Sequence, residues 1–135
     1  MFRSRIVCCL FFGCSMACFG SIAEAQVSPL LQAYPCGPDG LTGPLRKLIP
    51  QGAFGADFRP ACRAHDACYD TPYSNRSQCD QQFLQNMLSA CSQSTHPILC
   101  RMTATTLYKV TRRRGQKSFE SAQRIAIDGV RKVRS

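Results

Sequence analysis

Six cysteines that follow residue 25 constrain this chain more than any other feature of its sequence. They are Cys36, Cys62, Cys68, Cys79, Cys91 and Cys100. An even number of cysteines in a short chain that leaves the cytoplasm predicts a disulfide framework. Such crosslinks matter because a small domain buries only a modest core, and each disulfide typically adds on the order of 2–4 kcal/mol. Six cysteines can pair in many ways, so their number alone does not choose a connectivity.

The first 25 residues predict export. Arg3 and Arg5 precede an apolar run over residues 6–19, and Ala23-Glu24-Ala25 is a small-x-small cleavage site. We therefore expect a signal peptide over 1–25 and a secreted, extracellular or periplasmic protein. Processing as a lipoprotein at Cys18 is a second possibility, because the preceding residues loosely resemble a lipobox. Nothing later in the sequence is apolar enough to span a membrane.

The remaining sequence predicts one all-α domain. Residues 26–57 are rich in Pro and Gly and predict an ordered loop region with a short helix over 45–48. Apolar residues then recur at helical spacing, and the first two long helices, joined by a short turn, should be roughly antiparallel. No strand signal of comparable strength is present. The expected helices cover about 58–70, 77–92 and 98–111, followed by a basic helical extension over 112–135.

The net charge of +9 lies largely in that extension. From residue 109 onward only Glu120 and Asp128 oppose nine basic residues: Lys109, Arg112, Arg113, Arg114, Lys117, Arg124, Arg131, Lys132 and Arg134. This excess favours an anionic partner. A phospholipid surface is expected rather than nucleic acid, because Phe119 is the one aromatic residue there for base stacking. The final helix is expected to pack its apolar stripe on the core, to lie in a membrane interface, or to do both.

The stretch from Cys62 to Asp70 carries the chemistry. On a helix, Cys62, His65, Asp66 and Tyr69 share one face. The face thus offers a proton acceptor beside a hard oxygen ligand. A zinc site built from Cys62, His65 and Cys68 is an alternative, which export disfavours because disulfides then replace free thiolates.

The run Cys-x-x-His-Asp-x-Cys-Tyr over residues 62–69 resembles the active-site helix of the secreted phospholipase A2 family, in its bacterial and group XII-like branches. The resemblance covers about residues 34–108. Cys36-Gly37-Pro38-Asp39-Gly40 looks like the family's calcium loop, and Cys79-Asp80 looks like the Cys-Asp pair on its second long helix. Two departures are Asp39, where Gly is usual, and Ala61, where a second Cys is usual.

The resemblance implies a catalytic set of His65, Asp80 and Tyr69. His65 would be the general base that takes a proton from the attacking water, since the pKa of an ordinary imidazole lies close to neutral pH. Asp80 would accept a hydrogen bond from the other ring nitrogen and so fix the tautomer. Tyr69 would hold Asp80 through its hydroxyl group.

The resemblance also implies a calcium ion as cofactor. Asp66 would bind Ca²⁺ through its carboxylate, with the backbone oxygens of Pro35, Gly37 and Asp39 as further ligands. The side chain of Asp39 is an alternative ligand, because Asp adopts the backbone conformations of Gly less readily. The ion would hold the negative charge that develops on the ester carbonyl.

The same resemblance implies disulfides Cys36–Cys62, Cys68–Cys79 and Cys91–Cys100. The activity that it implies is calcium-dependent hydrolysis of the sn-2 ester of glycerophospholipids to a fatty acid and a lysophospholipid. The alternative is a non-catalytic, cationic module on the same scaffold that binds membranes or polyanions.

Overall fold

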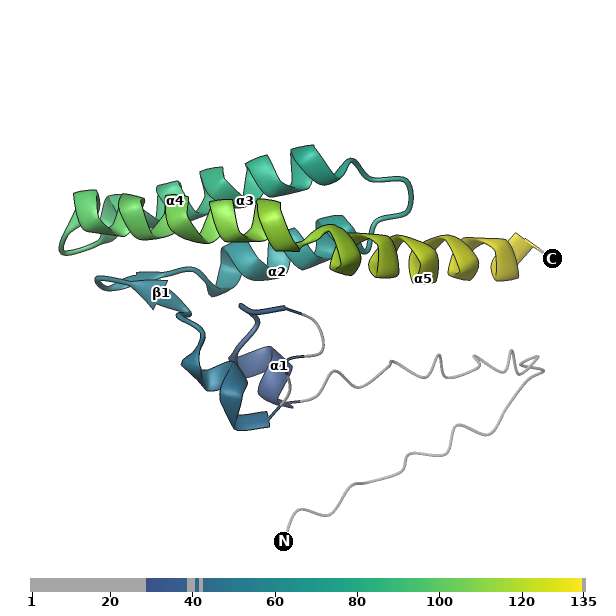
Figure 1. Cartoon of the computed structure of the whole chain (residues 1–135), viewed down its shortest axis with the longest axis horizontal. Helices are drawn as coiled ribbons and strands as arrows, with labels where there is room; N and C mark the ends of the chain where they lie inside the picture. Colours follow the sequence, from purple (N-terminus) through teal and green to yellow (C-terminus); the bar gives the residue numbers. More distant parts are fainter. Residues whose placement is uncertain (1–28, 39–40, 42, 135) are drawn as a thin grey trace, which may run out of the picture.

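The computed structural model describes residues 29–38, 41 and 43–134 of the chain, and this part is mostly helical (Figure 1). The expected signal peptide and Asp39 lie outside the described residues. In chain order the elements are α1 (Pro29–Ala33), the 3-10 helix η1 (Gly43–Leu48), β1 (Gly52–Ala53), β2 (Ala56–Asp57), α2 (Arg59–Tyr69), α3 (Arg76–Ala90), the 3-10 helix η2 (Cys91–Gln93), α4 (Pro97–Arg114) and α5 (Gln116–Arg134). None of the described helices is long and apolar enough to cross a membrane.

The expected helices are confirmed, with ends that differ by a few residues. The start of α2 differs because Phe58, not Asp57, occupies the N-cap position. Asp57 still stabilises the first turn of α2, because its Oδ1 accepts a hydrogen bond from the backbone N–H of Arg59 at 2.9 Å. The small antiparallel hairpin of β1 and β2 was not expected, because strands of two residues are too short to show an alternating pattern.

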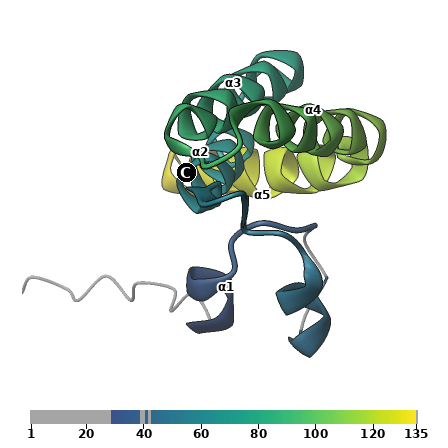
Figure 2. The same cartoon turned by 90° about the vertical axis from the view of Figure 1, so that its left-hand side faces the viewer.

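The helices α2 and α3 are antiparallel, as predicted. The side chain of His65 meets Asp80, whereas Cys68, further along α2, is bonded to Cys79, earlier on α3. Thr71-Pro72 ends the first helix, and the side chain of Asn75 caps the second by accepting a hydrogen bond from the N–H of Gln78. Figure 2 shows α2 to α5 grouped together, with α1 and the segment before β1 on one side of them.

The three expected disulfides are all present. Cys36–Cys62 joins the N-terminal loop region to α2, Cys68–Cys79 joins α2 to α3, and Cys91–Cys100 joins η2 to α4. Because Cys62 and Cys68 are both oxidised, the alternative zinc site with His65 is wrong.

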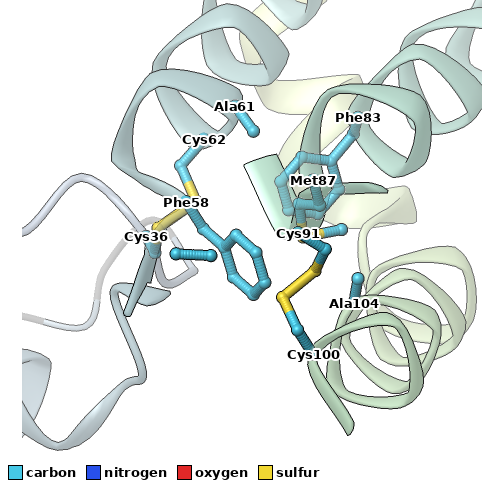
Figure 3. Close-up of a cluster of buried hydrophobic side chains, with 10 residues drawn as sticks. Cys36, Phe58, Ala61, Cys62, Phe83, Met87, Cys91, Cys100 and Ala104 are labelled. Atoms are coloured by element: carbon cyan, nitrogen blue, oxygen red, sulfur yellow. A yellow bond between two sulfur atoms is a disulfide. The ribbon is translucent and has the colours of Figure 1, made fainter. Parts of the chain in front are cut away.

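The core lies where α2, α3 and α4 meet, and two disulfides form part of it (Figure 3). Phe58, just before α2, and Met87 on α3 are completely buried, together with the Cys91–Cys100 bridge. Ala104 on α4 is also completely buried, and a small side chain there lets α4 pack closely. The crosslinks therefore supply part of the apolar core as well as covalent ties.

The basic C-terminal segment is continuous with the domain. α4 runs on to Arg114, so the expected boundary after residue 111 falls inside a helix. The first half of α5 packs on α2: the Phe119 ring meets the edge of Tyr69, and the Gln123 amide donates to the carbonyls of Tyr69 and Thr71. Packing on the core is thus observed for this half, and the interfacial alternative stays a prediction.

Met87 and Met102 provide a matched test of this core. Met87→Ala should lower the free energy of unfolding by about 2–5 kcal/mol, because it removes a completely buried side chain and leaves a cavity. Met102→Ala, at an exposed position, should change it by less than about 0.5 kcal/mol. Urea unfolding followed by circular dichroism measures both, and equal losses would contradict the core described.

Candidate active site

The proposed catalytic residues lie together in the structure, between α2 and α3. His65 Nε2 lies 2.9 Å from Asp80 Oδ1, and both side chains are buried. An ionised carboxylate only accepts hydrogen bonds, so the proton of this contact belongs to Nε2. The lone pair of the neutral imidazole is therefore on Nδ1, as a general base requires.

Asp80 is completely buried, and further donors converge on its carboxylate. The hydroxyl group of Tyr69 donates to Oδ1 at 2.5 Å, and Arg112 Nη1 donates to Oδ2 at 3.3 Å. Arg76 Nε lies 3.7 Å from Oδ2, so its charge faces the carboxylate without a hydrogen bond. Burying a carboxylate is costly unless it is paired, and these partners supply the pairing.

Tyr69 is fixed as a hydrogen-bond donor to Asp80. Burial raises the pKa of Tyr69 above its ordinary value, and the hydrogen bond to Asp80 raises it further. The phenol consequently stays protonated across the physiological range. The His65 ring packs against Tyr69 and Phe83, whose ring centroids are 4.2 Å and 4.7 Å away, and this packing restricts the orientation of the imidazole.

Asp66 lies on the other side of the His65 ring. Its Oδ1 is 4.0 Å from His65 Nδ1, and about half of its side-chain surface is exposed. The Cys36–Cys62 disulfide attaches the N-terminal loop to α2 one helical turn before Asp66. Cys36 is thereby tied to the helix that carries the carboxylate.

Arg46 is an unexpected component of that loop. Its side chain comes from η1, only 2 % of the residue is exposed, and its guanidinium donates four hydrogen bonds to backbone carbonyls. The acceptors are Tyr34 at 2.7 Å, Pro35 at 2.9 Å, Pro38 at 3.1 Å and Leu41 at 3.2 Å. One buried cation thus ties together the carbonyls of residues 34, 35, 38 and 41.

The residues expected to bind calcium differ in how well this geometry suits a metal. The Pro35 carbonyl already accepts from Arg46, and a cationic donor 2.9 Å away opposes a second cation there. Gly37 has a φ of 132°, and a Cβ atom there would lie 3.4 Å from Ile49, so glycine suits this position. Asp66, whose carboxylate is half exposed, has the oxygen chemistry that calcium prefers. Asp39 is not described.

Sequence reasoning missed the contributions of Arg46, Arg76 and Arg112 to the site and its loop. Arg112 was assigned to the extension because it lies in a run of three arginines. Arg76 ties three helices together, donating to the Arg112 carbonyl at 2.5 Å and to Gln116 Oε1 at 2.6 Å. A basic residue four positions before Asp80 on one helix was the available signal for this pair.

Comparison with known proteins identifies no relative: no family model, curated protein or solved structure matches the chain.

The hydrogen bonds of Arg46 lead us to expect that the backbone around it depends on this one side chain. Arg46→Met should lower the hydrogen-exchange protection factors of the Cys36 and Leu41 amides by about tenfold or more. The reason is that four backbone carbonyls of this loop lose their hydrogen-bond donor. Lys47→Met, at the exposed neighbouring position, is the control and should leave the protection unchanged. Mass spectrometry with peptide-level resolution measures both. Retained protection in Arg46→Met would show that the loop does not depend on this cation.

At Gly115, which follows the last residue of α4, there is no room for a side chain beside Tyr69. A Cβ atom there would lie 3.1 Å from Tyr69 Oη and 2.7 Å from the Thr111 carbonyl oxygen. Gly115→Ala should therefore lower the unfolding temperature. Gly129→Ala meets nothing within 4 Å in the middle of α5, so it should raise stability by up to about 1 kcal/mol. Thermal unfolding compares the two, and equal effects would rule out the crowding at Tyr69.

Proposed function

We propose that this chain is a secreted, calcium-dependent hydrolase resembling phospholipase A2, which cleaves the sn-2 ester of glycerophospholipids to a fatty acid and a lysophospholipid. The observation that carries this proposal is the buried pair of His65 and Asp80, with Tyr69 donating to the same carboxylate oxygen. A buried carboxylate that orients an imidazole is the arrangement needed to activate a nucleophile. The partially exposed Asp66 beside it supplies a ligand for a cation.

In the proposed reaction, His65 Nδ1 removes a proton from water as the water oxygen attacks the ester carbonyl. The imidazolium that forms donates from Nε2 to Asp80, whose negative charge stabilises it. The same proton then passes from Nδ1 to the departing alkoxide of the lysophospholipid, which regenerates the neutral imidazole. Calcium bound by Asp66 and loop carbonyls would supply positive charge to the developing oxyanion.

The proposed site of action is outside the cytoplasm, at an anionic phospholipid surface. Three disulfides in the described residues suit an oxidising compartment. The net charge of +9 and the basic residues of α4 and α5 suit anionic headgroups.

The alternative is a cationic module without catalytic activity, which would bind membranes or other polyanions. The basic residues of α4 and α5 support it equally well, because their charge does not depend on His65. The hydrogen-bonded set around Asp80 favours the enzyme, since a binding module has no need of an oriented imidazole. A test must therefore separate ester hydrolysis from binding.

Fatty-acid release from phospholipid in mixed detergent micelles makes that separation. His65→Gln should lower the rate by about a hundredfold or more, because it removes the base. His96→Gln is a matched control at an exposed position and should retain the wild-type rate. Chelation of calcium should abolish release in the wild type. Release that survives both chelation and His65→Gln would exclude the proposed mechanism, and no release from the wild type would favour the binding module.

A further inference from the structure

The first turns of α4 expose three large apolar side chains. Ile98 is 77 % exposed, Met102 is 62 % exposed and Leu99 is 46 % exposed. Met102 lies three residues after Leu99 and four after Ile98, so the three side chains share the outward face of the helix. Cys100 and Ala104 on the opposite face are completely buried, so packing on α3 uses the other side of α4.

The tip of the β-hairpin carries a further exposed apolar side chain and is bonded to the segment just before α4. Phe54 has a φ of 52°, unusual for a residue with a side chain, and the residue is 41 % exposed. Its carbonyl accepts hydrogen bonds from the N–H and hydroxyl of Thr95, at 2.9 Å and 3.0 Å, which fix the tip beside the start of α4 (Figure 1). We call Phe54, Ile98, Leu99 and Met102 the tip patch.

The surroundings of the tip patch are cationic. The sequence from Gln81 to Phe119 contains no Asp or Glu. Arg101 is exposed next to the patch, and Lys109 and Arg113 continue the outward face further along α4. Apolar side chains therefore occupy the end of the molecule, and basic side chains follow along the same helix.

We propose that the tip patch docks on an anionic phospholipid bilayer, with its apolar side chains below the headgroups and Arg101, Lys109 and Arg113 against lipid phosphates. Charge complementarity selects this partner, because the surface combines exposed apolar area with cations and has no carboxylate on α4 to oppose them. In α5, Phe119 on the apolar stripe is already packed against Tyr69, whereas Ile125 and Val133 are exposed and make the second half of that helix the competing surface.

The inference rests on the proposed function for the choice of a phospholipid surface, but docking itself requires no turnover. It is therefore measured with calcium chelated, so that hydrolysis does not alter the vesicles. If the protein docks on vesicles but releases no fatty acid, the proposed function is contradicted and the docking inference is not. If the protein releases fatty acid from micelles but does not dock through the tip patch, the docking inference is contradicted and the proposed function is not.

The chain contains no tryptophan, so single substitutions can report on each surface by fluorescence. Met102→Trp places the probe in the tip patch, and Val133→Trp places it on α5, where Val133 is 88 % exposed. With phosphatidylglycerol vesicles, emission from position 102 should shift to shorter wavelength and be shielded from an aqueous quencher, whereas emission from position 133 should change little. Phosphatidylcholine vesicles should give a weaker response, as should high salt.

Met102→Gln provides the matching affinity measurement by vesicle co-sedimentation. It should weaken binding by about tenfold or more, because an inserted methionine gains the transfer free energy of its apolar surface. Leu48→Gln, at a position 75 % exposed outside the patch, should bind like the wild type.

Three outcomes would overturn the inference. The first is a shift at position 133 with none at position 102, which would assign docking to α5. The second is co-sedimentation with vesicles that Met102→Gln leaves unchanged, which would assign it to another surface. The third is a shift at position 102 that depends on protein concentration without vesicles, which would make the tip patch an interface between copies of the chain.

Discussion

The buried carboxylate of Asp80 is the constraint on which the arrangement of the helices depends. Its charge can be removed from water only if donors surround it, and a single element cannot supply them all. His65 and Tyr69 come from α2, Arg76 comes from the first turn of α3, and Arg112 comes from the last turn of α4. The position of each helix is therefore linked to the others through one functional group.

The connection continues into α5. Gly115 allows the chain to pass close to Tyr69 Oη, and Phe119 then covers the Tyr69 ring. The segment that composition marks as a basic extension is consequently part of the wall of the candidate site. Its positive charge has two separate uses: Arg112 neutralises a buried carboxylate, while the exposed cations nearby remain available to an anionic surface.

The candidate site and the loop beside it are each built around one buried charged group that has several hydrogen-bonding or charged partners. In the site, the carboxylate of Asp80 is surrounded by donors. In the loop, the guanidinium of Arg46 is surrounded by carbonyls, in the region where the family resemblance implies a metal. A side-chain cation needs no binding equilibrium to organise the loop. Under the proposed function, calcium would then act mainly on the substrate rather than on the backbone that Arg46 holds.

Local sequence determined much of this protein. The periodicity of apolar residues predicted the long helices, and the spacing around His65 predicted which side chains share a face, because both depend on helix geometry alone. Resemblance of short motifs supplied the disulfide pairing, which the structure contains. Only the tertiary structure decided the contacts of Arg46, Arg112 and Gly115, and the hydrogen bonds of Phe54 to Thr95 just before α4. These depend on which distant segments meet, and a buried charge can be satisfied by any donor that packing brings within reach, which no local pattern specifies.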